Sequence, residues 1–215
     1  MSGPLLVALT GIDGAGKTTQ AKRLANRFRD DGYVTSYEHL TSSHFGVASA
    51  IKERCAGPLL EFESSIAGSN RTTDDSSVGL AGPLGLLTLV RGIWRSYLNV
   101  VRNRDADVVF LDRFLYDDLV RAAWTYGYSL DRTVPLVSIV PRPDFVCYLD
   151  LEPELAWERE SDGTTSPDEH RWKKEWYDRV VSRLDDRADI VTIDTASHDV
   201  DAVERRLYAT VRDRL

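Results

Sequence analysis

Short apolar runs alternate with longer amphipathic stretches along most of the chain. The apolar runs lie at 5–10, 33–37, 107–111, 144–149 and 189–193. The amphipathic stretches predict helices at 17–31, about 45–55, 84–104, 115–126, 153–160, 168–187 and 199–214. Residues 108–111 and 145–149 are apolar throughout, as expected for strands that are buried on both faces. The alternation predicts a three-layer α/β fold in which helices cover both faces of a five-stranded parallel sheet.

Two polar stretches interrupt this alternation. Residues 56–83 are rich in Gly, Ser, Thr and Asp, and residues 161–167 read Ser-Asp-Gly-Thr-Thr-Ser-Pro. A long loop without secondary structure inside a compact α/β domain is usually functional or disordered. We expect residues 56–83 to form a flap on the substrate side, with disorder as the alternative. The sequence contains no internal repeat and no boundary of a second domain, so residues 1–215 are expected to form a single domain.

The most specific motif lies between the first apolar run and the first predicted helix. Residues 11–18 read Gly-Ile-Asp-Gly-Ala-Gly-Lys-Thr, a complete Walker A loop. Its glycines let the backbone fold around phosphates with N–H groups pointing inward, and the following helix adds the positive end of its dipole. In such loops the lysine, here Lys17, reaches the β- and γ-phosphates, and the hydroxyl of Thr18 can ligate Mg²⁺. The motif therefore predicts a P-loop NTPase fold that binds a nucleoside triphosphate.

The acidic composition narrows the range of partners. The formal net charge is −7 and the isoelectric point is about 5.2, which argues against a nucleic-acid groove as the main working surface. No stretch approaches 18 consecutive apolar residues, and the chain enters its first strand without a signal sequence. Cys55 and Cys147 lie far apart and fit reduced thiols. We therefore expect a cytoplasmic protein with no membrane partner.

An acidic residue follows the third apolar run. Asp112 ends this run, and Arg113 comes directly after it. Ligands of open α/β sheets bind at the carboxyl ends of the strands, where P-loop proteins place the carboxylate that organises Mg²⁺. A guanidinium beside it can bind a phosphate through two hydrogen bonds. We expect Asp112 to organise Mg²⁺, and the alternative is that it caps the helix that begins near residue 115.

These segments together resemble the thymidylate kinase family of nucleoside monophosphate kinases. Residues 11–20 are similar to that family's P-loop, and residues 112–114, Asp-Arg-Phe, are similar to its Asp-Arg-Tyr motif. Residues 153–159 resemble the segment that leads into the family's lid. Residues 193–196, followed by Val200, resemble the C-terminal strand and loop that pack near adenine. The similar segments occur in the same order along most of the chain.

The resemblance implies an activity and a set of site residues. The implied reaction is phosphoryl transfer from ATP to a nucleoside monophosphate, dTMP + ATP giving dTDP + ADP, with Mg²⁺ as cofactor and small-molecule nucleotides as partners. A lid is implied at about 160–174, and a homodimer through the helix near 84–104, although no residue requires a dimer. The implied ATP-binding residues are Gly11, Asp13, Gly14, Ala15, Gly16, Lys17, Thr18, Thr19 and Arg159, with Thr18 and Asp112 at the metal. The implied acceptor-binding residues are Asp13, Arg91 and Arg113, of which Asp13 faces the sugar.

The family also supplies a catalytic arginine from either the P-loop or the lid. Here the P-loop position holds Ala15, so the lid is expected to provide the positive charge that phosphoryl transfer needs. Arg171, Lys173 and Lys174 are the available donors, and a solvated helix start is the alternative reading of this segment. The residues predicted to take part in catalysis are Lys17, Asp112, Arg113 and Arg171.

Three segments on the acceptor side depart from the family pattern. Thr10 stands where the family usually has Glu, and residues 38–41 stand where it has Arg-Glu-Pro-Gly. Residues 117–122 stand where the family has Ser followed by Ala-Tyr-Gln-Gly. We expect the two aspartates that begin this segment to lie at a solvated helix start. The alternative is that they bind a second cation or a substrate hydroxyl. A site that hydrogen-bonds its substrate rejects unmatched analogues. Altered polar groups at these positions can change the acceptor, so one alternative to a thymidylate kinase is a related kinase for another phosphorylated nucleoside or small metabolite. A second alternative is a nucleotide-binding module without catalytic activity.

Overall fold

The computed structural model describes residues 3–39, 94, 98, 102–118, 120, 142–160, 166–184 and 189–215. In chain order the elements are β1 (Leu5–Thr10), α1 (Lys17–Asp30), β2 (Thr35–His39), β3 (Val108–Asp112), β4 (Phe145–Asp150), α6 (Pro153–Arg159), α7 (Pro167–Leu184), β5 (Ile190–Asp194) and α8 (Val200–Arg212). The five strands form one parallel sheet in the order β2-β3-β1-β4-β5. The predicted five-stranded parallel sheet is confirmed, and each strand begins and ends within two residues of its predicted position.

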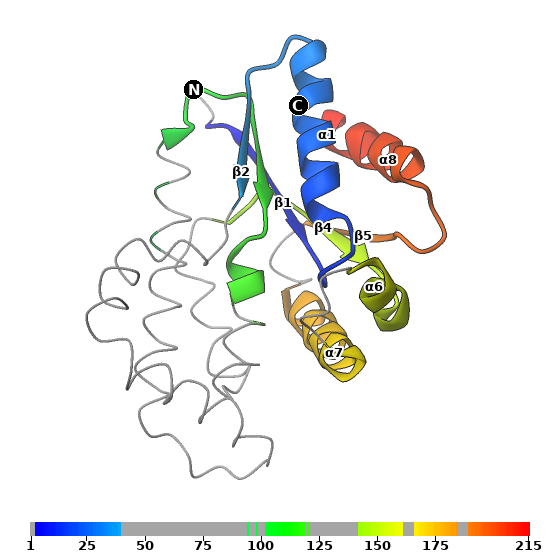
Figure 1. Ribbon diagram of the computed structural model, residues 1–215. Helices are drawn as coiled ribbons and strands as arrows, with labels where there is room; N and C mark the ends of the chain where they lie inside the picture. The colour runs from blue at the N-terminus through cyan, green and yellow to red at the C-terminus, as the bar shows by residue number, and fades with distance from the viewer. Residues whose placement is uncertain are drawn as a thin grey trace, which may run out of the picture.

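Strand β1 lies at the centre of the sheet, between β3 and β4 (Figure 1). Its register pairs Leu9 with Asp112 of β3, and Asp112 in turn pairs with His39 of β2. The carboxyl ends of these three strands therefore lie side by side. The chain leaves β1 toward β2 on one side, while β4 and β5 lie on the other. Ligands of open α/β sheets bind at such a change of direction, and here it is followed directly by the glycine-rich loop.

Helices α1 and α8 pack against each other on one face of the sheet (Figure 1). Helix α1 buries Ala21, Leu24, Ala25 and Phe28, whose spacing of three and four residues places them on one side of the helix. The ring of Phe28 is fully buried and contacts the rings of Phe110 and Tyr208. This packing fixes the axis of α1, and therefore the position of its N-terminus.

Helices α6 and α7 lie beyond the carboxyl end of the sheet and pack together (Figure 1). Pro153 begins α6, where a missing N–H costs nothing. Helix α7 carries Asp168 and Glu169 in its first turn, where negative charge favours the helix dipole. The predicted helices at 153–160 and 168–187 are thus present, close to their expected bounds.

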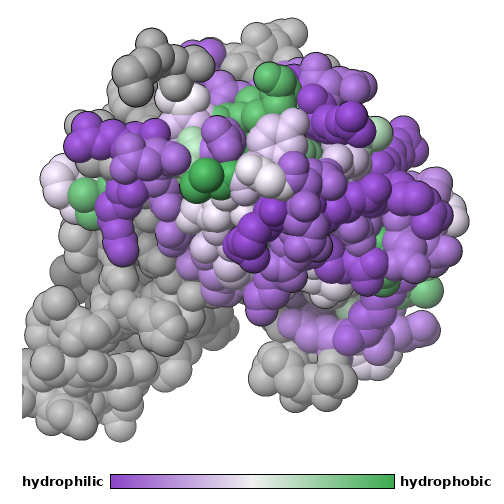
Figure 2. Space-filling view, turned by 90° about the horizontal axis from the view of Figure 1, so that it is seen from above, coloured by the Kyte–Doolittle hydropathy of each residue, from purple (hydrophilic) through white to green (hydrophobic). Residues whose placement is uncertain are grey.

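Several predicted features lie outside the described residues. These are the flap at 56–83, the helix at about 45–55, most of the helices at 84–104 and 115–126, and residues 161–165 of the lid. Seen from the top of Figure 1, the described surface is mostly hydrophilic (Figure 2). Within the described ranges, every helix is too short or too polar to cross a membrane.

Candidate active site

The loop after β1 needs glycine at two positions because neighbouring backbone lies close to it. Gly11 has φ +143°, and a Cβ there would lie 2.4 Å from the carbonyl oxygen of Leu149. Gly14 has φ +84°, and its Cβ would lie 2.6 Å from the carbonyl oxygen of Ala156. L-residues rarely adopt such φ values, and no side chain fits in either space. The loop is therefore held against the end of β4 and against α6.

Helix α1 begins at the end of this loop without a side-chain cap. Its N-cap residue is Gly16, which has no side chain to accept from the first amide groups. Uncapped N–H groups at a helix N-terminus form a site for an anion, since the helix dipole also favours negative charge there. Thr19, in the first turn, belongs to the same segment. The predicted phosphate-binding loop thus has the backbone that its chemistry requires.

Lys17 is buried and points back over the loop. Its Nζ donates hydrogen bonds to the carbonyl oxygens of Gly11, at 2.6 Å, and Ile12, at 2.7 Å. A carboxylate oxygen of Asp13 lies 3.7 Å from the same nitrogen. Burial lowers the pKa of Lys17, and attraction to Asp13 partly offsets this effect. The ammonium group is thus held at the mouth of the loop by acceptors that the loop itself provides.

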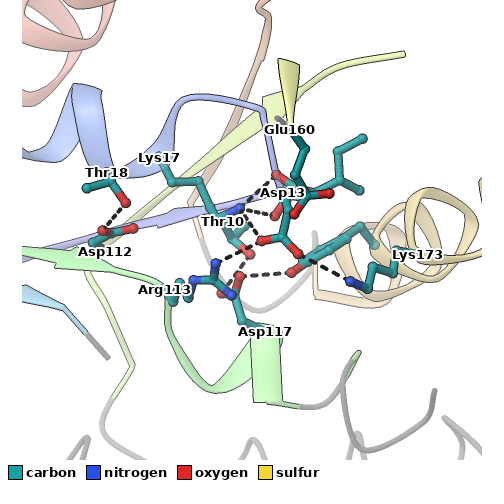
Figure 3. Close-up of polar contacts among 12 residues, drawn as sticks. Thr10, Asp13, Lys17, Thr18, Asp112, Arg113, Asp117, Glu160 and Lys173 are labelled. Atoms are coloured by element: carbon teal, nitrogen blue, oxygen red, sulfur yellow. Dashed lines mark hydrogen bonds and ion pairs between the residues drawn. The ribbon is translucent and has the colours of Figure 1, made fainter. Parts of the chain in front are cut away.

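Asp13 lies among three cations that come from three segments of the chain (Figure 3). Besides Lys17, Arg113 Nη2 donates to its Oδ1 at 2.8 Å, and Lys173 Nζ of α7 donates to its Oδ2 at 3.2 Å. Burial alone would raise the pKa of Asp13, but attraction to Lys17, Arg113 and Lys173 holds it well below its usual range. Asp13 is therefore ionised and joins the three cations, while Glu169, 3.0 Å from Lys173, is a second anionic partner of that lysine.

Asp112 meets Thr18 at the carboxyl end of the sheet. Its Oδ2 accepts hydrogen bonds from the Thr18 hydroxyl at 2.6 Å and from the Tyr37 hydroxyl at 2.9 Å, and lies 2.6 Å from Nδ1 of His39. Its Oδ1 is buried and has no hydrogen-bond partner among the described residues. The alternative that Asp112 caps the helix near residue 115 is not observed, because the partners of its Oδ2 are Thr18, Tyr37 and His39 and its Oδ1 has none among the described residues. The two predicted metal ligands are thus in direct contact.

Arg113 has an unusual backbone conformation. Its φ is +74°, and it is the one non-glycine residue with positive φ in the described part of the chain. Such a conformation costs of order 1–3 kcal/mol and persists when surrounding contacts enforce it. Its Nε is buried and has no hydrogen-bond partner among the described residues. Burial alone would lower the pKa of Arg113, but Asp13 and Asp117 raise it, so the guanidinium stays charged.

Asp117 is buried, contrary to the expectation of a solvated helix start. Its Oδ2 accepts from the Thr10 hydroxyl at 3.1 Å and from the N–H of Phe114 at 2.9 Å, and its Oδ1 accepts from the Tyr177 hydroxyl at 2.8 Å. Burial raises the pKa of Asp117, partly offset by Lys17 and Arg113. Residues 10 and 117, which lie in separate departures from the family pattern, therefore contact each other.

Of the predicted lid cations, Lys173 lies at the site and Arg171 lies at the surface. Arg171 is half-exposed, and its guanidinium contacts Glu154 at 2.8 Å and Asp168 at 3.0 Å. Lys173, two residues later, reaches Asp13 instead. Burial alone would lower the pKa of Lys173, but Asp13 and Glu169 outweigh it and raise the pKa. The structure thus brings Lys173 to the loop and places Arg171 on the outside of the helix.

The remaining predicted ligands lie on either side of this centre. Arg159, at the end of α6, donates from Nη2 to the carbonyl oxygen of Thr195 at 3.2 Å, which brings it to the loop after β5. Ala15 is buried beside the loop glycines. Arg91 lies outside the described residues. Sequence reasoning did not identify Tyr37 or Tyr177, and it placed His39 near the acceptor side but expected a surface role for it. The register of β2 brings Tyr37 and His39 to Asp112, and the rotation of α7 brings Tyr177 to Asp117.

Comparison with known proteins gives thymidylate kinases among the sequence relatives of this chain. A probable thymidylate kinase of Pyrococcus abyssi is 32% identical over 146 residues, which cover 67% of this chain and 64% of that protein. The thymidylate kinase of Xylella fastidiosa is 32% identical over 161 residues, covering 73% of this chain and 65% of that protein. The chain thus spans slightly less than two thirds of the length of the first relatives it matches. No family model matches the chain.

A solved structure confirms the fold. The deoxyadenosine kinase from M. mycoides with bound dCTP aligns with a TM-score of 0.57 at 14% sequence identity, covering 97% of this chain and 99% of that one. At this identity the likeness concerns the fold alone. The sequence relatives confirm the resemblance to the thymidylate kinase family. The structural neighbour confirms the predicted α/β fold.

Proposed function

We propose that the protein transfers the γ-phosphoryl group of ATP to a nucleoside monophosphate, with dTMP as the first acceptor to test. The observation that carries the proposal is the convergence of Lys17, Arg113 and Lys173 on the single carboxylate of Asp13, at 2.8 to 3.7 Å. Phosphate oxygens of the substrates would take the place of this carboxylate as partners of the three cations. Phosphoryl transfer depends mainly on such charge neutralisation and on positioning.

ATP would occupy the loop side of this cluster. The amide groups of residues 11–18 and the uncapped start of α1 would bind its phosphates, and Lys17 would exchange its two carbonyl acceptors for phosphate oxygens. Arg159, held near Thr195, would lie against the adenine. The relatives are named as kinases, and a kinase needs a phosphoryl donor, which supports ATP as a substrate.

Thr18 and Asp112 fit a magnesium ion. Their oxygens are the ligand type that Mg²⁺ prefers, and the buried, unpartnered Oδ1 of Asp112 provides an acceptor beside the Thr18 hydroxyl. Among the described residues no group of three His, Cys, Asp or Glu side chains could hold a metal on its own, so phosphates and water would complete the coordination. When bound, Mg²⁺ would neutralise charge on the β- and γ-phosphates.

The acceptor would bind on the side of Arg113. Its charged guanidinium, with an unpartnered Nε, is suited to the phosphate of a nucleoside monophosphate. Asp13 would then turn from the cations to the sugar hydroxyl, and Arg91 would be the second guanidinium at the acceptor phosphate. From α7, Lys173 is the cation that we assign to the transferring group in place of Arg171, because it already contacts the loop.

A coupled ADP-release assay across deoxy- and ribonucleoside monophosphates tests the proposal directly. We expect turnover with dTMP, and loss of turnover in Lys17→Ala with the circular dichroism spectrum unchanged, because the loop then lacks its buried cation. Turnover with a different monophosphate would support the proposed phosphoryl transfer but contradict dTMP as the acceptor. ATP binding without ADP production from any monophosphate would favour the non-catalytic module, and near-normal activity of Lys17→Ala would contradict the site.

Arg113→Ala should impair use of the acceptor far more than use of ATP. Losing a partly buried charged contact costs about 2–4 kcal/mol, or about 30- to 1000-fold in kcat/KM for the monophosphate. Steady-state kinetics with each substrate varied in turn measures this effect. Arg23→Ala is the matched control, because Arg23 pairs with Asp201 and Glu204 on the outer side of α1. Equal losses toward both substrates would contradict the assignment.

Lys173→Ala and Arg171→Ala should separate the two lid cations. Because Lys173 reaches the loop and Arg171 contacts surface carboxylates, we expect kcat to fall by about 10- to 100-fold in the first variant and by less than about threefold in the second. Single-turnover measurements keep product release from masking the chemical step. The reverse order of effects would return the catalytic role to Arg171.

Asp13→Asn should destabilise the protein in a pH-dependent way. The folded-state pKa of Asp13 lies below its unfolded value of about 3.9, so the ionised carboxylate stabilises the fold above that pH and loses this effect as the pH falls. We expect a loss of about 1–3 kcal/mol in the free energy of unfolding at pH 7, which shrinks progressively as the pH falls below about 5. Urea titrations of both proteins measure the difference. Asp201→Asn, an exposed aspartate that pairs with Arg23, should show a much smaller difference.

A further inference from the structure

The conformation of Arg113 is set by the two peptide groups that flank it. The N–H of Arg113 donates to the carbonyl oxygen of Leu9 in β1 at 3.1 Å. The next N–H, that of Phe114, donates to Oδ2 of Asp117 at 2.9 Å. Rotation about either backbone bond of Arg113 would break one of these hydrogen bonds. The strained φ of +74° is thus enforced from one side by the central strand and from the other side by Asp117.

Asp117 joins this turn to two other segments (Figure 3). Its own N–H donates back to the carbonyl oxygen of Phe114 at 3.0 Å, so the two residues form the reciprocal bonds of a helix start. Its carboxylate also accepts from the hydroxyl of Thr10 at the end of β1 and from the hydroxyl of Tyr177 on α7. One buried carboxylate therefore fixes the turn relative to the strand and to the helix.

Helix α7 connects Asp117 to the active site, because it carries both Tyr177 and Lys173. Lys173 and Tyr177 are four residues apart and lie on the same face of the helix. Lys173 donates to one oxygen of Asp13, while Arg113 donates to the other. The contacts thus close a ring through Arg113, Asp13, Lys173, Tyr177 and Asp117. A shift of Asp117 would move both cations that we assign to the transfer reaction.

We propose that Asp117 is a positioning residue that holds Arg113 toward the acceptor phosphate and keeps α7 in place through Tyr177. The carboxylate acts through the protein, because its three contacts are the backbone of Phe114 and the hydroxyls of Thr10 and Tyr177. The proposal rests on the proposed function in one respect, namely that Arg113 binds the acceptor.

A double-mutant cycle with Asp117→Ala and Arg113→Ala tests this role. We expect Asp117→Ala to raise the KM for the monophosphate by about 10- to 100-fold, since a charge-assisted support of Arg113 is lost, and to leave the KM for ATP within about threefold. In the Arg113→Ala background the same substitution should change the acceptor KM by less than about threefold, because the residue it positions is gone. Additive effects, or equal changes in both KM values, would overturn the proposal.

Tyr177→Phe and Tyr148→Phe form a matched pair of variants, a test and its control, and both leave the carboxylate of Asp117 in place. Both remove a tyrosine hydroxyl that binds an aspartate and helps to seat α7, but Tyr148 binds Asp178 rather than Asp117. We expect only Tyr177→Phe to lower kcat, because Lys173 then loses its position at Asp13. This pair decides the question if Asp117→Ala does not fold, and equal effects of the two substitutions would count against the proposal.

Crystal structures of the unmodified protein and of Asp117→Ala, or of Tyr177→Phe if the first variant does not fold, separate this proposal from the proposed function. We expect Arg113 to leave its positive φ and to lose its hydrogen bond to Asp13 in Asp117→Ala, and Lys173 to move from Asp13 in Tyr177→Phe. An unchanged Arg113 and an unchanged Lys173 would overturn the positioning role. If the unmodified protein phosphorylates no monophosphate, the proposed function fails, and these structures alone still decide whether Asp117 holds the turn.

Discussion

The attraction between Asp13 and its three cations sets the arrangement of the site at the end of the sheet. Lys17, Arg113 and Lys173 come from the loop, from the turn after β3 and from α7, and without a shared anion they would repel one another. Because the cluster is partly buried, this repulsion would be screened less than at the surface. Asp13 lowers this repulsion, and Glu169 lowers it further at Lys173. In the proposed reaction, substrate phosphates would take over part of this role.

The backbone supports this cluster from the other side. At Gly11 and Gly14 the loop lies so close to the carbonyl groups of Leu149 and Ala156 that no side chain could be accommodated. The loop, the end of β4 and the start of α6 must therefore move together or not at all. Amide groups fixed in this way do not have to reorganise when a phosphate arrives, which is the condition under which such dipoles stabilise a transition state well.

The sequence predicts the sheet, the phosphate loop and the pairing of Thr18 with Asp112, because each depends on local pattern or on the rule that strand ends gather ligands. It does not predict Tyr37 and His39 on Asp112, since these contacts require the register between β2 and β3. The choice between Arg171 and Lys173 depends on the rotation of α7 about its axis, which residue spacing leaves open. The contact between residues 10 and 117 joins positions that are 107 residues apart.

This last contact changes how the departures from the family pattern bear on the acceptor. Taken separately, Thr10 and Asp117 are two polar changes near the expected base-binding side, and both argue against dTMP. In the structure they are one change, because the carboxylate and the hydroxyl face each other across the same hydrogen bond. The hydrogen bonds of Asp117 go to the N–H of Phe114 and to the hydroxyls of Thr10 and Tyr177, so in the proposed site this pair would support Arg113 and would not read the base. For the proposed acceptor dTMP, the changes at Thr10 and Asp117 therefore carry no weight against it, and the question of the base rests on residues 38–41 and 118–122.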